Sequence, residues 1–367
     1  MDSNKENPSG YLKGRGAQVN PHNHFLKNDY VKEHVEGIDD WEEKNTKTTF
    51  IFGDAKSVVN KVDSPDVGMA YSLNPYQGCE QGCTYCYARN SHEYWGFSAG
   101  LEFERKIIVK KEAPQLFRKF LEKKGWDAGI ISLSGNTDCY QPAERRFKLT
   151  RQLLQIALEY KQPVGMITKN SLVLRDLDIL KEMAQEKLCM VYVSINSLNE
   201  DLRLKMEPRT ATAAQRLKVV EQLSAAGIPV GVMVAPLIPG LSDHEVPAIL
   251  KAIAARGATN AGYTVVRLNG AIGGIFKDWL EKNYPDRFDK VWHMIQSCHA
   301  GKVNDSRFGE RMRGNGNIAQ LISDTFKLHC KLNKLNLKPV ELDSSKFRVP
   351  KAQLNLFEER KQTPLID

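Results

Sequence analysis

The stretch N-P-Y-Q-G-C-E-Q-G-C-T-Y-C-Y-A-R, residues 74–89, decides how the rest of this chain is interpreted. It contains three of the seven cysteines, Cys79, Cys83 and Cys86, in the spacing C-x-x-x-C-x-x-C. Iron–sulfur clusters held entirely by protein take four cysteines, so three thiolates predict a [4Fe-4S] cube with one iron open to a ligand that is not protein. A structural zinc ion, which favours four closed ligands, and three buried inert cysteines are the alternatives.

The composition is that of a globular protein, with 367 residues, 41% hydrophobic and 26% charged. This length permits one large α/β domain with extensions, or two domains. The first residues do not have the apolar core of a signal peptide, and no apolar run is long enough to span a membrane. Because the cysteines are odd in number and mostly scattered, they predict a reduced, cytoplasmic protein rather than a disulfide framework. The net charge of +8 slightly favours a polyanionic partner.

From about residue 70, short apolar or β-branched runs alternate with amphipathic helical patterns. The expected strands are Ala70–Asn74, Gly129–Ser134, Pro163–Thr168, Met190–Ile195, Pro229–Ala235 and Gly262–Leu268. The expected helices between them are Pro114–Lys124, Ala143–Tyr160, Leu172–Glu186, Ala211–Ala226 and Asp243–Arg256, and Gly227 is an expected helix C-cap. Six such repeats predict an α/β fold with a parallel, barrel-like sheet, in which chemistry gathers at the C-terminal strand ends.

Three regions follow from this pattern. Residues 1–68 are predicted to form an irregular N-terminal extension laid over the domain. Residues 69–270 are predicted to form the barrel, and residues 271–367 a helical C-terminal region with a flexible tail. In this last region the patterns predict helices over Ile275–Lys282, Asp286–Ala300 and Ile318–Leu332.

The run Asn74–Arg89 resembles the cluster loop of the radical S-adenosylmethionine (SAM) superfamily. The resemblance implies a partial (β/α)6 TIM-like barrel, a [4Fe-4S] cluster on Cys79, Cys83 and Cys86, and SAM bound at the open iron. It also implies an enzyme that reductively cleaves SAM to a 5′-deoxyadenosyl radical. The aromatic residue that precedes the third cysteine packs near the adenine in that family, and here it is Tyr85.

The same resemblance assigns further SAM contacts to the strand ends. After the second strand, small and polar residues would meet the amino group of SAM, namely Ser134, Gly135, Asn136 and Thr137. After the fourth strand, Ser194 and Asn196 would meet the ribose, and Arg209 of the motif E-P-R would bind the carboxylate. Pro236 belongs to the proline-rich stretch that resembles the adenine-binding segment. For most of these residues ordinary turns, caps or surface positions are the alternative.

The run from about residue 74 to residue 269 looks most like the branch that contains spore photoproduct lyase, often described as DNA repair photolyase-like. The motif T-D-x-Y-Q-P over residues 137–142 carries this resemblance, as does V-x-V-A-P-x-I-P-G-L over residues 232–241. Cys139 follows Asp138, whereas the hydrogen-donating cysteine of the lyase precedes the equivalent aspartate, so that role does not transfer by position. We nevertheless predict Cys139 or Tyr140 as a hydrogen donor, with a buried packing role as the alternative.

The predicted substrate is a DNA lesion, with RNA or tRNA modification, protein maturation, and a non-catalytic Fe-S scaffold as alternatives. A flavodoxin or ferredoxin is the expected reductant. In the tail, Gln353–Phe357 match Q-L-x-L-F, a peptide by which bacterial repair proteins dock on the DNA polymerase sliding clamp. A terminal hook that packs on its own domain is the alternative for this segment.

Overall fold

The computed structural model describes residues 11–26 and 47–350. Its largest sheet has seven strands in the order β10-β9-β8-β7-β6-β3-β2. Six neighbours pair in parallel: β3 (Tyr71–Leu73), β6 (Ile131–Leu133), β7 (Val164–Thr168), β8 (Cys189–Ser194), β9 (Val230–Leu237) and β10 (Asn260–Val265). The short strand β2 (Val59–Lys61) pairs antiparallel with β3. The six expected strands are therefore confirmed, and they follow the chain in order across the sheet, as a partial (β/α)6 barrel requires.

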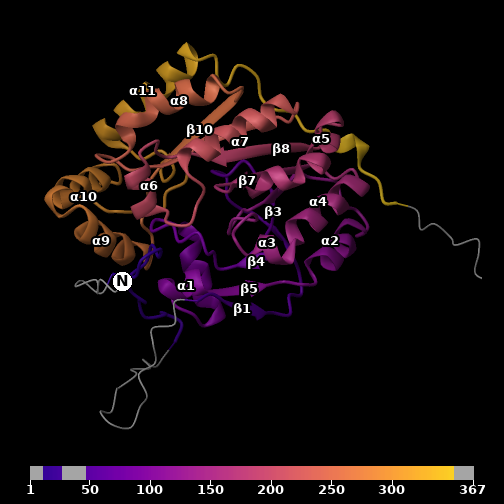
Figure 1. Ribbon diagram of the computed structural model, residues 1–367, viewed down its shortest axis with the longest axis horizontal. Coiled ribbons are helices and arrows are strands. Elements are labelled where there is room, and N and C mark those ends of the chain that lie inside the picture. Colours follow the sequence, from indigo (N-terminus) through magenta and orange to yellow (C-terminus); the bar gives the residue numbers. More distant parts are fainter. Residues whose placement is uncertain (1–10, 27–46, 351–367) are drawn as a thin grey trace, which may run out of the picture.

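Helices cover the outside of this curved sheet and follow one another around it (Figure 1). They are α2 (Ala113–Leu121), α3 (Glu144–Phe147), α4 (Leu149–Glu159), α5 (Leu177–Gln185), α7 (Ala213–Ala225) and α8 (Val246–Ala254). The short helix α6 (Glu200–Met206) packs instead against the segment around Cys83. Each longer helix buries an apolar stripe against the strands; in α4 the stripe includes Leu153, Leu154 and Ala157. Gly227 follows α7 with φ +75°, which confirms the expected glycine at a helix end.

Two expected helices are interrupted in the structure. The pattern over Ala143–Tyr160 forms α3 and α4, because Lys148 between them adopts a left-handed conformation with φ +52°. The pattern over Leu172–Glu186 begins as the 3-10 helix η2 (Ser171–Asp176) and continues as α5. Asn170 caps η2, since its side-chain oxygen accepts the Leu172 amide hydrogen at 3.0 Å.

The C-terminal region is helical, as expected. Its elements are α9 (Ile272–Asn283), η4 (Pro285–Arg287), α10 (Phe288–Ser297), α11 (Gly316–Leu332) and η5 (Ser344–Lys346), and α11 packs against α8. Within the described ranges, no helix has the length and apolar character needed to cross a bilayer. The sharp boundaries expected at residues 68 and 270 stay a prediction.

A second, smaller sheet was not predicted. It has the order β1-β5-β4, with β1 (Thr49–Phe52) parallel to β5 (Lys106–Val109), and β4 (Tyr76–Gln77) antiparallel to β5. The strand β5 follows the short helix α1 (Leu101–Arg105) directly, and its four residues were too few to stand out as a strand pattern. This sheet positions the candidate site, because its edge strand β4 leads straight into Cys79.

Candidate functional site

The cysteine loop connects β4 to the 3-10 helix η1 (Tyr87–Trp95) at the C-terminal end of the parallel strands. Gly78 and Gly82 both have left-handed φ values, +79° and +71°. A Cβ atom on Gly78 would lie 2.8 Å from the Lys106 carbonyl oxygen, so only glycine permits this close approach. The Cys79 amide donates to the Phe103 carbonyl at 2.9 Å. The loop is thus fixed against β5 and α1, with Cys79 and Cys83 buried and Cys86 half-buried.

The donor set of this loop fits a [4Fe-4S] cluster. Burial raises the pKa of the Cys79 thiol well above its usual value, and the charges of Asp138, Cys83 and Cys86 raise it further. Thiolates in such a place need compensating positive charge, which iron supplies. Two buried polar atoms of the loop, Glu80 Oε2 and Thr84 Oγ1, lack a hydrogen-bond partner among the described residues. The loop therefore has the thiol ligands for a bound group and two buried polar atoms that are free to hydrogen-bond to it.

A single structural zinc ion requires ligands that converge on one point. Across residues 11–26 and 47–350, no three His, Cys, Asp or Glu side chains converge closely enough to hold one ion. In a four-iron cube each cysteine binds a different iron, so the three sulfurs do not have to meet at one point. His92, the histidine nearest to the three cysteines in sequence, is fully buried between Phe97 and Phe103, with ring centroids at 5.3 and 5.5 Å.

Arg89 supports the backbone of the cysteine loop through hydrogen bonds. Its Nε donates to the Cys83 carbonyl at 2.9 Å, and its Nη1 donates to the carbonyls of Ala99 and Gly100 at 3.1 and 2.9 Å. Its Nη2 forms an ion pair of 2.5 Å with Glu104, and both side chains have no exposed surface. A buried arginine whose three nitrogens all donate to fixed acceptors holds the backbone on which Cys83 depends.

The N-terminal segment of residues 14–17, here called the strap, also binds to Glu104. The Glu104 carboxylate accepts the backbone amides of Gly16 and Ala17 at 3.1 and 2.8 Å. Arg15 is buried and donates to the Glu104 carbonyl at 2.8 Å. The extension was expected to lie over the domain, but its direct contact with the cysteine loop was not foreseen. The sequence of the strap does not reveal that Glu104 is its partner, because Glu104 lies about 90 positions further along the chain.

We expect Gly16→Ala to weaken both the fold and the cluster site. A Cβ atom at residue 16 would lie 1.7 Å from the Gly82 carbonyl oxygen, so the strap or the loop must shift. Overpacking of this kind costs about 1–3 kcal/mol. Thermal unfolding and iron content after anaerobic reconstitution measure the effect. Gly68→Ala is the matched control, since a Cβ there meets nothing within 4 Å. Equal iron content in both variants would contradict a role of the strap in the cluster site.

Tyr85 anchors the other side of the loop to the strand ends. Its hydroxyl donates to Glu207 and accepts from Asn196 Nδ2 at 3.3 Å. Glu207 is fully buried and forms an ion pair with Arg216, whose Nη1 donates to the Ser194 carbonyl at 2.9 Å. Tyr85, Ser194 and Asn196, predicted separately from the sequence, are therefore brought together. Asn196 Oδ1 is buried without a partner among the described residues, so this acceptor is available to a bound group.

Glu207 and Arg216 were missed as site residues. The motif E-P-R drew attention to Arg209, whereas in the structure the glutamate of the same motif holds Tyr85. Arg209 lies over the loop, where its Nε donates to the Gly14 carbonyl at 3.0 Å and its amide to the Gln81 carbonyl at 3.3 Å. Its carboxylate-binding role stays a prediction. The signal that could have found Arg216 is a charged residue on the apolar face of an amphipathic helix.

The turn after β6, residues 134–137, also contacts the residues around the cysteine loop. The Gly135 carbonyl accepts the Tyr87 hydroxyl at 2.9 Å, and Thr137 Oγ1 donates to the Tyr76 carbonyl at 2.8 Å. Asn136 Nδ2 donates to Gln77 Oε1 and Ser91 Oγ, both at 3.0 Å. Ser134 has φ +71° and accepts the Cys139 amide at 2.8 Å. These contacts place the turn beside β4 and the cysteine loop, and contact with an amino group stays a prediction.

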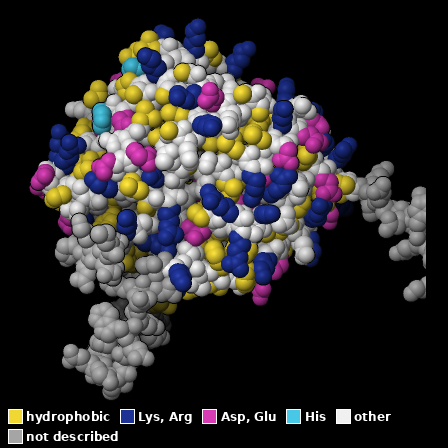
Figure 2. Space-filling model, in the orientation of Figure 1, with side chains coloured by type: hydrophobic (Ala, Val, Ile, Leu, Met, Phe, Trp, Pro, Cys, Tyr) yellow, Lys and Arg dark blue, Asp and Glu magenta, His cyan; other side chains and the backbone are white. Residues whose placement is uncertain are grey.

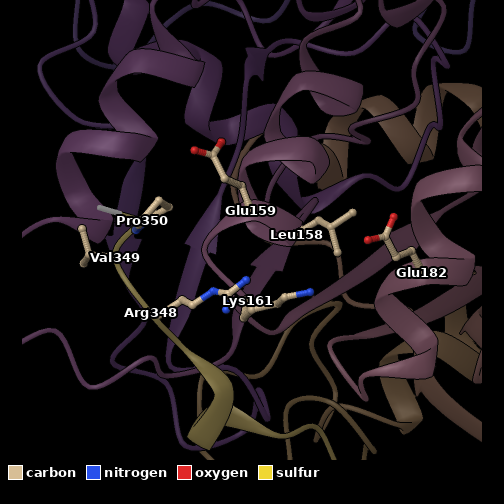
Figure 3. A pocket seen from close by; sticks show the side chains of 7 residues that line it. All are labelled: Leu158, Glu159, Lys161, Glu182, Arg348, Val349 and Pro350. Carbon is tan, nitrogen blue, oxygen red and sulfur yellow. The ribbon is translucent and has the colours of Figure 1, made fainter. Parts of the chain in front are cut away.

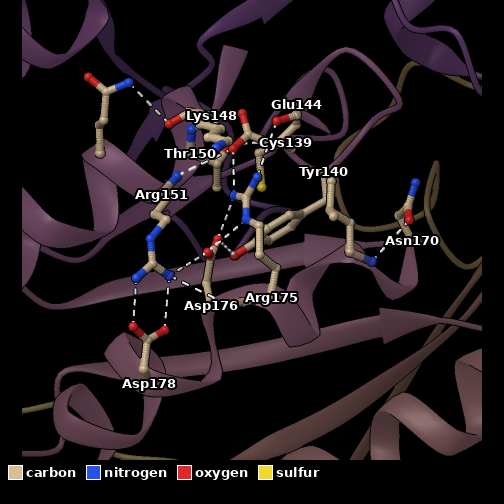
Figure 4. Close-up of polar contacts among 12 residues, drawn as sticks. Cys139, Tyr140, Glu144, Lys148, Thr150, Arg151, Asn170, Arg175, Asp176 and Asp178 are labelled. Atoms are coloured by element: carbon tan, nitrogen blue, oxygen red, sulfur yellow. Dashed lines mark hydrogen bonds and ion pairs between the residues drawn. The ribbon is translucent and has the colours of Figure 1, made fainter. Parts of the chain in front are cut away.

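The remaining predicted residues are Pro236, Cys139 and Tyr140. Pro236 is near the C-terminal end of β9, at the same edge of the sheet. Cys139 and Tyr140 are fully buried in the main hydrophobic core. Figure 4 shows the Tyr140 hydroxyl directed toward Asp176, to which it donates at 3.2 Å, within a network that also includes Arg175 and Glu144. These positions favour a packing role for both residues, and the donor role stays a prediction.

A separate hollow of about 640 Å³ lies elsewhere (Figure 3). It is lined by Leu158, Glu159, Lys161, Glu182, Arg348, Val349 and Pro350. Lys161 precedes β7, so this hollow lies toward the N-terminal ends of the strands, opposite the cysteine loop. It is therefore not part of the candidate site.

Comparison with known proteins agrees with this geometry. Residues 73–253 match the Radical SAM superfamily. The chain is 34% identical over 234 residues to an uncharacterized protein of Mycobacterium tuberculosis, covering 63% of this chain and 69% of that protein. It is 30% identical over 247 residues to an uncharacterized protein of Methanocaldococcus jannaschii, covering 67% and 88%. The chain therefore belongs to the radical SAM superfamily.

Among solved structures, the fold is similar to spore photoproduct lyase with bound AdoMet and dinucleoside spore photoproduct. The TM-score is 0.56 at 19% identity, with 82% of this chain and 85% of the lyase chain covered. The protein is thus a radical SAM enzyme with the partial-barrel fold, and its cofactors are a [4Fe-4S] cluster and SAM. When bound, these cofactors supply a one-electron reductive cleavage that yields a 5′-deoxyadenosyl radical.

Proposed function

We propose that this enzyme acts on a lesion in DNA. The observation that carries the proposal is the aromatic and basic character of the surface beside the cysteine loop. Tyr87 directly follows Cys86 and is 51% exposed; its pKa is raised by desolvation, and the charge of Arg267, two residues beyond β10, partly offsets this. Exposed aromatic side chains stack on bases, and arginine binds phosphate. The net charge of +8 and the dinucleoside photoproduct bound by the similar lyase add support.

In this proposal the chain's own residues bind and orient SAM. Cys79, Cys83 and Cys86 hold three irons, while Tyr85, fixed by Glu207 and Arg216, provides a rigid aromatic wall. Asn196 Oδ1, which has no partner among the described residues, would accept a hydrogen bond from a ribose hydroxyl. We further propose that the turn over residues 134–137 binds the amino group of SAM and that Arg209 binds its carboxylate. Ser194 would contact the ribose, and Pro236 the adenine.

The test uses anaerobically reconstituted protein with dithionite and SAM. Formation of 5′-deoxyadenosine is measured without substrate, with UV-irradiated DNA and with the same DNA undamaged. Formation that rises only with damaged DNA supports a lesion substrate. Slow formation that ignores DNA keeps the enzyme class and redirects the search to RNA or protein. No formation despite a loaded cluster would leave only the Fe-S scaffold.

The hydrogen-donor role of Cys139 is a separate prediction. A donor role requires that Cys139→Ala lose turnover or change the product, with 5′-deoxyadenosine formation retained. A packing role predicts unchanged product and a loss of about 1–3 kcal/mol in the free energy of unfolding, because the side chain is fully buried. Product analysis by mass spectrometry together with denaturant unfolding distinguishes the two, and Cys189→Ala, in the same core, is the matched control.

We also propose that the chain binds the DNA polymerase sliding clamp through Gln353–Phe357, which lie outside the described residues. The double substitution Leu356→Ala, Phe357→Ala is expected to abolish clamp capture in a pull-down, because the two apolar anchors fill a hydrophobic pocket in this mode of recognition. Substitution of Lys351 and Lys361 by alanine provides a control in the same tail. Capture that survives loss of both anchors would exclude the proposed docking peptide. The electron donor, a flavodoxin or ferredoxin, is likewise a proposal.

A further inference from the structure

A group of aromatic and basic side chains lies on the small sheet, away from the cysteine loop. It comprises Phe50 and Phe52 of β1, Phe147 and Arg146 of α3, and Lys111, and is called here the aromatic–basic patch. The Lys111 Nζ lies 3.4 Å from the Phe52 ring centroid, and the Arg146 guanidinium lies 5.5 and 5.2 Å from the rings of Phe50 and Phe147. The Phe147 ring is 5.1 Å from Phe50 and 6.0 Å from Phe52.

The patch reaches solvent mainly through Phe52 and is surrounded by positive charge. Phe52 is 52% exposed, whereas Phe50 and Phe147 are half-buried against the core below. Lys111, Arg145, Arg146 and Lys148 are exposed. Figure 2 shows dark-blue side chains gathered, with hydrophobic ones between them, over the region where Figure 1 places α3, β5 and β1. Three carboxylates belong to these segments. Glu144 is buried and bonded to Tyr76 and Arg175, while Asp54 and Glu112 are exposed, so cations still outnumber the accessible acids.

The patch is connected to the candidate site in two ways. Its outer strand β1 is two strands from β4, and β4 runs into Cys79, which places the patch about 10 Å from that strand. On the other path, Trp95 is 41% exposed and packs against the position of Gly53, next to Phe52. Trp95 ends η1, which begins at Tyr87 beside Cys86. Exposed aromatic side chains therefore mark both ends of the helix between the patch and the cysteine loop.

We propose that the aromatic–basic patch binds a single-stranded segment of the nucleic acid substrate and directs it toward Tyr87 and Cys86. The inference rests on the proposed function and extends it to the form of the substrate. Aromatic rings on a sheet surface stack with unpaired bases, and adjacent lysine and arginine side chains bind the phosphates. In a duplex the bases are already stacked and paired, so rings of this kind favour an unpaired strand. An acidic protein would use the cations but gain little from the exposed rings.

The test measures binding of fluorescent single-stranded DNA, about 20 nucleotides long, to the reconstituted full chain by anisotropy at several salt concentrations. The charge-reversal variant Lys111→Glu, Arg146→Glu is expected to bind about tenfold or more weakly, with a shallower salt dependence because two phosphate contacts are lost. Phe52→Ala is expected to bind about five- to tenfold more weakly with unchanged salt dependence, since stacking is not ionic. The double variant Lys218→Glu, Lys251→Glu, on the exposed faces of α7 and α8, is the charge-matched control.

Iron content and substrate-free 5′-deoxyadenosine formation, which the patch does not touch, verify that each variant is folded and loaded. If the double variant Lys111→Glu, Arg146→Glu and the single variant Phe52→Ala both bound DNA with wild-type affinity, the proposed binding role of the patch would be wrong. The proposed function would still stand. A wild-type chain that binds neither single-stranded nor duplex DNA would overturn both. A charge-reversal variant that binds DNA normally but is no longer reduced by flavodoxin would assign the surface to an acidic protein and overturn the inference.

Discussion

Substitution of Cys86 by alanine is expected to abolish formation of 5′-deoxyadenosine. In the predicted cluster each of the three cysteines would bind a different iron, so removal of one would leave a second iron without a protein ligand. Cys86 is the most informative of the three because it is half-buried, whereas Cys79 and Cys83 are buried, and its loss disturbs the fold least. Iron and acid-labile sulfide in the anaerobically reconstituted protein, with the electron paramagnetic resonance signal after dithionite reduction, measure the cluster directly.

Cys330→Ala is the control for this experiment. Cys330 is a buried cysteine of α11, far along the chain from the loop, and packs in the main core. The control is expected to keep its iron, its reduced-cluster signal and its rate of SAM cleavage. If Cys86→Ala retained a full complement of iron and cleaved SAM at the rate of the control, the assignment of the three-cysteine loop as the cluster site would be wrong.

The second large effect is expected at Glu104. Its carboxylate has no exposed surface and accepts hydrogen bonds from Arg89, Gly16 and Ala17, so it joins the cysteine loop to the strap. Glu104→Ala leaves the Arg89 charge buried without its partner, which costs about 3–5 kcal/mol in the free energy of unfolding. Denaturant unfolding of the apoprotein measures this loss, and iron content after reconstitution measures the disorder transmitted to Cys83 through Arg89.

An exposed ion pair supplies the comparison. Arg118 and Glu159 are 2.6 Å apart with both side chains 42% exposed, and Glu159→Ala is expected to cost less than about 1 kcal/mol. A Glu104→Ala protein as stable and as rich in iron as the Glu159→Ala protein would refute the supporting role of the buried pair. A protein that is destabilised but fully loaded with iron would separate the fold from the cluster site.

The sequence by itself determined the six parallel strands, most of the helices and the cysteine loop. These features are local: period-2 and period-3.6 patterns lie within about 20 residues, and the cysteine spacing lies within 8 positions. The sequence also predicted that polar groups at separate strand ends would meet, and Tyr85, Ser194 and Asn196 do lie together. That success follows from parallel topology, which puts all carboxyl strand ends at one edge.

The tertiary structure alone decided which partners support those residues. Glu104 holds the strap from 87 positions away, Glu207 holds Tyr85 from 122 positions away, and β1 meets β5 across more than fifty residues. Tertiary packing also placed Cys139 in the core, although its neighbours in sequence point to the site. A contact between distant segments depends on how the whole chain packs, and no local pattern records it, because burial and charge pairing are satisfied only after the sheets have assembled.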